Sequence, residues 1–494
     1  MREEAEGRAI AEIEKAVEAD ARAEAETARS TESIARARAE KQKTRIAIAA
    51  GLLAAIALGL GLFAQTRLDR ESQQKALASG ALIGKAETLL KTHNQLEALE
   101  ASVEALSQFK EIGQKDSSEL QRIQTVISNV KEQDRLQAHK GGAYGLSFSP
   151  DGKTIVSGGE DGSIRIWNLS NNKVSPFIKE HSDAVKMVKF SPDGQLFASA
   201  SLDKTVKIWD IQGNLIHSFD YGDYVYNVSF SKSNQKIAAS GLDRGVIIWD
   251  LKTRKIFRVL KKSDYLTSDF LKIRGIAFSP MDESVLVTTG TEDKFDIIFW
   301  NVNNKIPKPK YVDMSQRGAT FSVDFSPMGD MVVSCDDNGN VYLRNAKGEL
   351  IGKVTDPGNG FYYVTFSADG KLIATADSST DIKIWQVDEL LREWRKNHSP
   401  VINPYEVLKG NSGAVTRLSF QRSNSVSKTT PETILASADE GGIVRVWHFN
   451  RSKINVSSHT KEGSVLLQEA CTSLGNYLKR NSRSRQEILK ICGI

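Results

Sequence analysis

The feature that most constrains how this chain can fold is a motif of about 40 residues that recurs from residue 139 onward. The first copy, GLSFSPDGKTIVSGGEDGSIRIWN, is followed by MVKFSPDGQLFASASLDKTVKIWD and then by more divergent copies. Within each copy, short stretches of alternating apolar and polar residues are separated by turn sequences such as SPDG and EDG, which predicts short antiparallel strands. The penultimate position of the motif marks seven copies: Trp167, Trp209, Trp249, Trp300, Arg344, Trp385 and Trp447.

A single sheet of such short strands cannot bury both of its faces, so the copies are expected to pack against one another in a ring. The last copy supplies three strands, and the segment NVKEQDRLQA, residues 129–138, has the register of an outer strand. We expect this segment to complete the last sheet, which joins the two ends of the ring and removes exposed sheet edges. The predicted fold class is therefore mainly β, with a ring of seven sheets over residues 129–450.

Two of the copies also share four polar positions with a fixed spacing. These are a His before the first strand, a Ser in the second strand, an Asp in the next turn and the Trp: His139, Ser157, Asp161 and Trp167 in the first copy, and His181, Ser199, Asp203 and Trp209 in the second. With this tetrad, residues 129–450 resemble the WD40-repeat family. The resemblance implies a seven-bladed β-propeller in which the tetrad is a buried hydrogen-bond chain that fixes each blade. A His–Ser–Asp set can also serve nucleophilic catalysis, but the structural role is favoured here.

The later copies depart from the tetrad. Tyr221 replaces the His of the third copy, and Arg344 replaces the Trp of the fifth. In copies five to seven, Asn338, Ser379 and Gly441 stand where the turn Asp is expected. We therefore expect blades five to seven to be less rigid than blades one and two.

The resemblance further implies that partners dock on the face where the first strand of each blade begins. Four residues before the Phe that ends each first strand, the sequence has Tyr144, Lys186, Tyr226, Arg274, Phe321, Tyr362 and Thr416, with Tyr224 and Lys272 two residues before two of these. Aromatic and cationic side chains are favoured at interface hot spots. We predict a surface for an acidic or mixed partner there, formed by Tyr144, Lys186, Tyr224, Tyr226, Lys272, Arg274, Phe321 and Tyr362. The alternative is that some of these residues only pack on neighbouring loops.

The N-terminal part of the chain is predicted to be helical. Residues 1–45 are mostly Ala, Glu, Arg and Lys and predict a charged helical lead. Residues 46–64, IAIAAGLLAAIALGLGLFA, contain no charge, and a helix of this length spans roughly 28 Å, close to the thickness of a bilayer core. This predicts one transmembrane helix, in preference to a signal peptide or a buried soluble helix.

The expected orientation of that helix follows from its flanks. Residues 27–45 contain six Lys and Arg, against three in residues 65–84, which places the N-terminus in the cytoplasm and the ring outside. Small residues recur every four positions at Ala47, Gly51, Ala55 and Gly59, a pattern that can pair helices and so form a homo-oligomer.

Two further helical segments are expected. Residues 65–128 predict a helical stalk with leucine stripes, one of which is Leu96, Leu99, Val103 and Leu106. The sequence GALIGKA lacks the spacing and the Ser or Thr of a phosphate-binding loop. Residues 451–494 predict a helical tail that caps the propeller. Cys471 and Cys492 flank a short helical pattern in this tail and their pairing is left open, and Cys335 is expected to be a buried thiol.

The order of these segments resembles the C-terminal half of bacterial, chiefly cyanobacterial, STAND-type signalling ATPases with WD repeats. The residues that carry this resemblance are NQLEALEASVEAL and LLQEACTSLGNYLKRN…ICGI. Those proteins have an NTPase module before the membrane helix and this sequence has none, as expected of a split or truncated relative.

Three functions are compatible with the sequence. The first is a membrane-tethered protein-interaction scaffold or sensor in signalling, whose partners are other proteins, a separate signalling NTPase among them. The second is a docking factor in envelope assembly or trafficking. The third, an enzyme with its site in the channel, is disfavoured because the seven histidines are scattered and suggest no catalytic or metal cluster. We expect no cofactor, and a net charge of +5 gives no indication of nucleic-acid binding.

Overall fold

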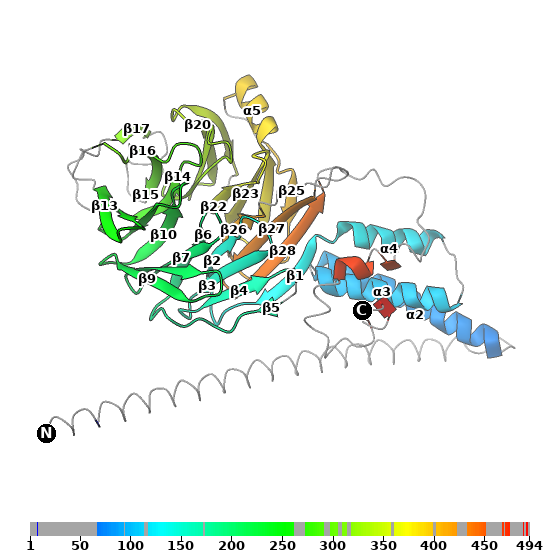
Figure 1. The fold of residues 1–494 in the computed structure, drawn as a ribbon. Coiled ribbons are helices and arrows are strands. Elements are labelled where there is room, and N and C mark those ends of the chain that lie inside the picture. The colour runs from blue at the N-terminus through cyan, green and yellow to red at the C-terminus, as the bar shows by residue number, and fades with distance from the viewer. Residues whose placement is uncertain are drawn as a thin grey trace.

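The computed structural model describes residue 7 and residues 67–92, 94–112, 117–170, 173–260, 272–290, 297–304, 309–313, 318–356, 360–398, 402–421, 432–450, 467–468, 470–474, 488 and 491–492. Seven four-stranded antiparallel sheets are arranged around an axis, and a group of helices lies to one side of them (Figure 1). The predicted seven-bladed propeller is therefore confirmed.

The strands of each blade occur in the same order from the axis outward. The innermost strands are β2 (Ala143–Phe148), β6 (Val185–Phe190), β10 (Val225–Phe230), β14 (Ile273–Phe278), β18 (Thr320–Phe325), β22 (Phe361–Phe366) and β26 (Val415–Phe420). The second strands are β3 (Thr154–Gly159), β7 (Leu196–Ser201), β11 (Lys236–Gly241), β15 (Val285–Gly290), β19 (Met331–Asp336), β23 (Leu372–Asp377) and β27 (Glu432–Asp439).

The outer half of each blade completes the sheet. The third strands are β4 (Ile164–Asn168), β8 (Thr205–Asp210), β12 (Val246–Asp250), β16 (Ile297–Asn301), β20 (Asn340–Asn345), β24 (Ile382–Gln386) and β28 (Ile443–Asn450). The outermost strands are β5 (Lys173–Val174), β9 (Leu215–Asp220), β13 (Lys255–Leu260), β17 (Pro309–Asp313), β21 (Leu350–Thr355), β25 (Glu406–Leu408) and, for blade seven, β1 (Glu132–Gln137).

The ring closes through this first strand. β1 pairs antiparallel with β28, with Leu136 opposite Val444, so the beginning and the end of the repeat region share blade seven, as predicted. The innermost strands contact one another in sequence, and β26 contacts β2. Serine side chains in inner strands accept hydrogen bonds from the backbone N–H of the Phe that ends the next inner strand: Ser147 from Phe190, Ser229 from Phe278 and Ser419 from Phe148.

The hydrophobic core lies between adjacent blades. Apolar side chains that alternate along the strands meet those of the next blade; Val156 and Ile164 of blade one, for example, pack with Val188 and Phe197 of blade two. Equivalent clusters occupy the remaining interfaces. Stacking of neighbours therefore buries both faces of sheets that are too small to be stable alone.

Three helices, α2 (Arg67–Lys91), α3 (Gln95–Ile112) and α4 (Ser117–Asn129), pack together beside blade seven (Figure 1). The stripe Leu96, Leu99, Val103 and Leu106 is buried in their shared core, where it meets Ile83 of α2. A fourth helix, α5 (Val387–Lys396), follows blade six and packs on β21 of blade five.

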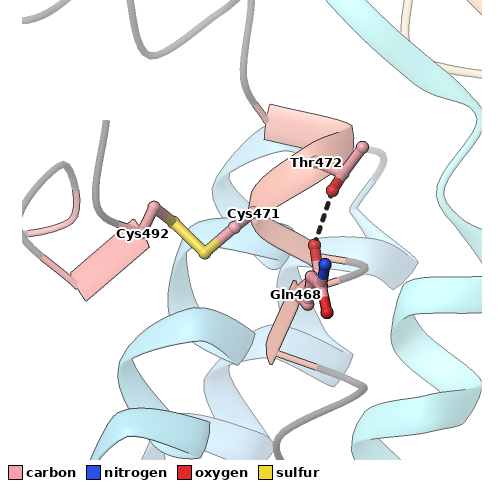
Figure 2. Close-up of a disulfide and its surroundings, with 4 residues drawn as sticks. All are labelled: Gln468, Cys471, Thr472 and Cys492. Atoms are coloured by element: carbon pink, nitrogen blue, oxygen red, sulfur yellow. Dashed lines mark hydrogen bonds between the residues drawn. A yellow bond between two sulfur atoms is a disulfide. The ribbon is translucent and has the colours of Figure 1, made fainter.

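The described residues of the C-terminal tail pack on these helices. Ala470, Leu474 and Ile488 belong to the same hydrophobic cluster as α2, α3 and α4, which differs from the predicted cap on the propeller. Figure 2 shows the disulfide between Cys471 and Cys492, which links two parts of the tail across 21 positions of sequence. The pairing that the sequence left open is thus present in the structure.

The predicted membrane helix requires a correction. No helix in the part of the chain that the structure describes is long and apolar enough to cross a membrane. The longest of them, α2, has 25 residues, but acidic and basic side chains recur along it, so it is an amphipathic helix that packs on its neighbours. Residues 46–64, on which the prediction was made, lie outside the described residues, as does the lead over residues 1–45 apart from Gly7.

The fold class is accordingly a seven-bladed propeller with a helical N-terminal region. A single-pass membrane location, with the orientation and helix pairing that depended on it, is not supported.

Candidate partner-binding site at the channel mouth

The seven positions predicted at the start of the innermost strands share one backbone feature. In every blade, the register between the first and second strands shifts between the first and third residues of the inner strand. The residue between them, left out of the ladder, is Tyr144, Lys186, Tyr226, Arg274, Phe321, Tyr362 or Thr416. Because a β-bulge turns its extra side chain away from the regular alternation, seven bulges display these side chains around one end of the channel, here named the channel mouth.

The structure brings two groups of these side chains together. The Nζ of Lys186 lies 3.5 Å from the ring centre of Tyr144. On the other side, the guanidinium of Arg274 lies 4.3 Å from the ring centre of Tyr226 and 6.0 Å from that of Phe321. Neighbouring blades therefore contact one another at the mouth through cation–π pairs.

The aromatic row continues into blade six. The ring centres of Phe321 and Tyr362 are 5.2 Å apart, and 41% of Tyr362 is exposed. Tyr224 is 40% exposed, with Lys204 5.9 Å from its ring centre, and Lys272 is also exposed. These three residues form an outer, accessible part of the predicted surface and do not join the cation–π pairs of the inner row.

Arg417 was not predicted, although it occupies the mouth together with the predicted residues. It follows Thr416 in β26, and its guanidinium donates hydrogen bonds to the carbonyl oxygens of Thr416, at 2.7 Å, and of Lys186, at 3.1 Å. Since Lys186 belongs to blade two and Arg417 to blade seven, this side chain extends past blade one. Its guanidinium also lies 5.1 Å from the ring centre of Tyr363.

Burial and charge perturb several groups at the mouth. Burial lowers the pKa of Lys186, and the charges of Arg417 and Arg274 lower it further. Burial likewise lowers the pKa of Arg417 and raises the pKa of Tyr363 to about 12. Three cations thus interact with one another in a partly desolvated place.

The tetrads of blades one and two form hydrogen-bond chains away from the axis. In blade two, the Nε2 of His181 lies 2.6 Å from Ser199 Oγ and its Nδ1 lies 2.7 Å from Asp203 Oδ2, while Trp209 donates to Ser199 at 2.8 Å. In blade one, the corresponding distances are 2.8 Å for His139–Ser157, 3.3 Å for His139–Asp161 and 3.2 Å for Trp167–Ser157.

The tetrad aspartates are strongly acidic. Burial raises the pKa of Asp203, but hydrogen bonds from His181 and Thr205 outweigh burial and lower that pKa well below its ordinary value. Asp161 behaves in the same way because His139 and Ser163 donate to it. Each serine oxygen is engaged by both a His and a Trp, so neither is disposed as a free nucleophile.

In blades five to seven, where the turn Asp of the tetrad is missing, an aspartate at another position supplies the buried hydrogen-bond acceptor. In these blades the second strand ends with an almost fully buried aspartate: Asp336 in blade five, Asp377 in blade six and Asp439 in blade seven. Each lies two positions before the place where the turn Asp is expected. Asp336 accepts hydrogen bonds from Asn340 and Tyr342, and Asp377 pairs with Lys383. The sequence contained this signal, since blades one to three have Gly159, Ser201 and Gly241 at the equivalent position.

Other substitutions in the tetrad also retain a hydrogen bond. Arg344 replaces the Trp of blade five, is fully buried, and donates to Ser334 at 3.1 Å. Tyr221, in the His position of blade three, donates its hydroxyl to the carbonyl of Gly245 at 2.6 Å. In blade seven, Asn411 occupies the His position, and its side-chain oxygen accepts a hydrogen bond from the Ser437 hydroxyl at 2.9 Å. This substitution was not predicted from the sequence.

A metal site is not indicated within the described ranges, where no group of three or more His, Cys, Asp and Glu side chains is placed to hold an ion. A cavity of about 260 Å³ lies away from the mouth and is lined by Asp134, Lys153 and His448 among others. The channel mouth remains the place where exposed aromatic and cationic residues from several blades converge.

Comparison with known proteins agrees with this architecture. The family described as "WD domain, G-beta repeat" matches at residues 130–168, 172–210, 213–250, 315–345 and 348–386. Five of the repeats that form this seven-bladed propeller are WD40 repeats. The five matches leave out all four strands of blade four and the last repeat, the two copies that carry insertions. WD40 propellers typically serve as scaffolds for protein interactions.

One curated relative is similar over a short segment. "DDB1- and CUL4-associated factor 13" of Dictyostelium discoideum is 46% identical over 43 residues, which are 9% of this chain and 10% of that protein. The matched segment is about the length of one WD40 repeat, so the similarity concerns a repeat unit rather than a whole protein.

Proposed function

We propose that this chain is a protein-interaction scaffold that binds a partner protein at the channel mouth of its WD40 propeller. The observation that carries the proposal is the set of seven bulges, which display aromatic and cationic side chains from six blades at one end of the channel.

The composition of this surface supports protein binding. Tyrosine, phenylalanine and arginine offer a large contact area and are enriched at the centres of interfaces. The inner row, Tyr226, Arg274 and Phe321, is held in place by its own cation–π contacts. The outer residues Tyr224 and Tyr362 are accessible. A rigid centre with exposed aromatic neighbours is typical of a preorganised binding surface.

A signalling role is the finer part of the proposal. The order of helices, propeller and Cys-bearing tail resembles the C-terminal half of WD-repeat signalling ATPases, which suggests a separate NTPase as the partner. The short similarity to a DDB1- and CUL4-associated factor suggests another class of partner, a ubiquitin-ligase component. The NTPase is favoured because that resemblance includes segments on both sides of the propeller, whereas the other is confined to 43 residues.

The experiment compares partner capture by three forms of the full-length chain. The double variant Tyr224→Ala with Tyr362→Ala removes exposed rings at the mouth. The matched control, Met328→Ala, removes a 69% exposed side chain in the turn after β18, at the opposite end of the blade. Partners are identified by quantitative mass spectrometry, and the affinity of each is then measured by biolayer interferometry.

We expect the double variant to bind at least about tenfold more weakly than the wild type, since losing two interface aromatic side chains costs more than about 1.4 kcal/mol. The Met328→Ala control should bind with wild-type affinity. Equal affinity of the double variant and the wild type for every captured partner would refute the channel mouth as the docking surface. Capture of an NTPase supports the signalling role, and its absence among mouth-dependent partners contradicts that role.

A further inference from the structure

The cations at the channel mouth have no acidic partner. Lys186, Arg274 and Arg417 come from blades two, four and seven, and none of them forms an ion pair with a carboxylate of the described chain. Two other cations of the propeller are paired: Lys383 lies 2.8 Å from Asp377, and Arg445 lies 2.5 Å from Asp439. The three cations at the mouth differ from these two in having no salt bridge within the described residues.

The hydrogen-bonding capacity of the two arginines is largely unused by protein atoms. A guanidinium has five N–H donors. Arg417 uses its two terminal nitrogens for backbone carbonyls, whereas the Arg274 guanidinium lies against the rings of Tyr226 and Phe321 and forms no hydrogen bond with the described residues. The Nε atoms of both arginines are buried and have no hydrogen-bond partner. A buried donor without a partner costs free energy in the unbound protein.

The charges at the mouth repel one another. Arg417 donates to the backbone carbonyl of Lys186, and Lys186 and Arg274 lie on the rings of Tyr144 and Tyr226 at the same mouth. The charges of both arginines accordingly lower the pKa of Lys186. Proteins retain such unfavourable clusters at functional sites, where a bound group of opposite charge relieves the repulsion. An anion at the mouth would accept the unused N–H donors and neutralise part of the positive charge.

The surroundings indicate which anion fits. Exposed carboxylates lie beside the cations: the charges of Glu160 and Glu440 act on Tyr144, and those of Glu160 and Asp183 act on Lys186. A polyanion such as a nucleic acid would be repelled by these groups. A single carboxylate on a peptide segment would reach the arginines while its neighbours contact the aromatic rings of the mouth.

We infer that the channel mouth is an acidic-residue site, in which Arg274 and Arg417 bind the carboxylate of one Asp or Glu side chain from the partner protein. The inference rests on the proposed docking function and specifies its chemistry. Tyr226, Phe321 and Tyr362 supply the apolar contacts on one side of the bound segment, and the carboxylates Glu160 and Asp183 on the other side favour a basic residue near the inserted acid.

The test uses fluorescence anisotropy of the full-length chain with labelled short peptides. The peptides have randomised flanks around a central glutamate, and an otherwise identical set has glutamine. We expect the glutamate set to bind at least about tenfold more tightly, the range for a charge-assisted contact in a partly desolvated site. Arg274→Met should remove this preference. Lys232→Met, at an exposed cation in the turn after β10 and at the opposite end of the blade from the mouth, should retain it.

Stability separates a binding role from a structural one. Arg274→Met loses the cation–π contacts with Tyr226 and Phe321, but it also removes the repulsion between Arg274 and Lys186, and Met still packs against both rings. Because the guanidinium donates no hydrogen bond to the described protein, we expect the Tm to change little. A clear fall in Tm would mean that the guanidinium holds the blades together, and would overturn the inference. Arg274→Lys is the second variant: it keeps the charge but loses the planar donor group, and we expect it to retain only part of the preference.

Competitors distinguish the source of the anion. Inorganic phosphate or a thymidine oligonucleotide that displaced the glutamate peptides at lower concentration than unlabelled glutamate peptide would overturn the assignment to a carboxylate. Equal binding of the glutamate and glutamine sets would overturn the site itself. If partner capture depended on Tyr224 and Tyr362 while no glutamate preference existed, the docking surface would stand and the acidic-residue site would fail. If a glutamate preference existed while partner capture did not depend on Tyr224 and Tyr362, only the proposed docking function would be refuted.

Discussion

The buried carboxylate of Asp439 provides a direct test of how the later blades hold together. This side chain is fully buried at the end of β27. It accepts hydrogen bonds from the N–H of Ser412 at 3.0 Å, the hydroxyl of Ser412 at 2.9 Å and the N–H of Ile443 at 3.0 Å, and it pairs with Arg445 at 2.5 Å. Arg445 also lies 3.1 Å from Glu132 of β1, the strand that closes the ring. Asp439 therefore stabilises the closure of the propeller.

The expected cost follows from these contacts. Asp439→Ala removes the ion pair with Arg445 and three hydrogen bonds from N–H and O–H groups to the same carboxylate. A hydrogen bond to a charged group is worth about 1.5–3 kcal/mol, but contributions that share one carboxylate are not additive. The substitution also leaves Arg445 buried with one acidic partner instead of two. Partial hydration of Ser412, which is exposed, reduces the total. We expect a loss of about 3–5 kcal/mol in the free energy of unfolding, the range for breaking a buried ion pair.

Urea unfolding followed by tryptophan fluorescence measures this loss. The urea concentration at the midpoint of unfolding should fall, while the slope of the free energy of unfolding against urea concentration stays unchanged. The matched control is Glu440→Ala, at the adjacent exposed residue, which should change the free energy of unfolding by less than about 0.5 kcal/mol. The double variant Asp439→Ala with Arg445→Met should be more stable than the sum of the single effects implies, since Glu132 retains Arg135 at 2.8 Å. A loss below about 1 kcal/mol for Asp439→Ala would refute this account of blade seven.

Three further predictions follow from other parts of the chain. The pKa of Asp203 in the folded protein lies below its ordinary value of 3.8, so the ionised carboxylate stabilises the fold above that pH, and this stabilisation is lost as the pH falls toward the native pKa. When the pH is lowered through this range, the Tm of Asp203→Asn should fall less than the Tm of the wild type. An identical fall would contradict the stabilising role of the Asp203 carboxylate. Burial raises the pKa of Cys335, so without reductant a maleimide should label no thiol in the folded chain and one after unfolding, while three labelled thiols would contradict the Cys471–Cys492 disulfide. The side chain of Gln95 accepts hydrogen bonds from the backbone N–H of Lys131 and Glu132 and donates one to the carbonyl of Lys409, at the junction of the helices and the propeller. Gln95→Ala should speed backbone hydrogen exchange at this junction. Unchanged exchange would show that other contacts hold the junction.

The tetrads show how much of the internal bonding was readable from the sequence. Blades one and two have the expected side chains at the expected spacing, and the structure places them within hydrogen-bond distance. In blades five to seven the same need is met by an aspartate two positions earlier. The loss of a motif residue was visible in the sequence, but its replacement was not recognised because the new residue acts from the strand instead of the turn. The expectation of lower rigidity in these blades stays a prediction.

The channel mouth was predicted in part. A fixed offset from the strand-ending Phe identified the seven side chains, because every inner strand has the same length and the same bulge. Arg417 was missed because it lies one position beyond that offset and reaches another blade, which no local pattern reports. The lack of a carboxylate beside Arg274 is likewise a property of the assembled ring.

The sequence by itself determined the number of blades and the closure of the ring. Both depend on local periodicity that is repeated seven times, and each repeat needs the next to bury its apolar face. Tertiary structure decided the rest: the tail joins the helices through Cys471 and Cys492, and the cations from three blades meet at the mouth. These outcomes depend on residues far apart in the chain, whose distances are fixed only when the blades and helices have packed. The membrane helix was inferred from the composition of residues 46–64 alone, without any partner contact, and the helices that the structure describes do not support it.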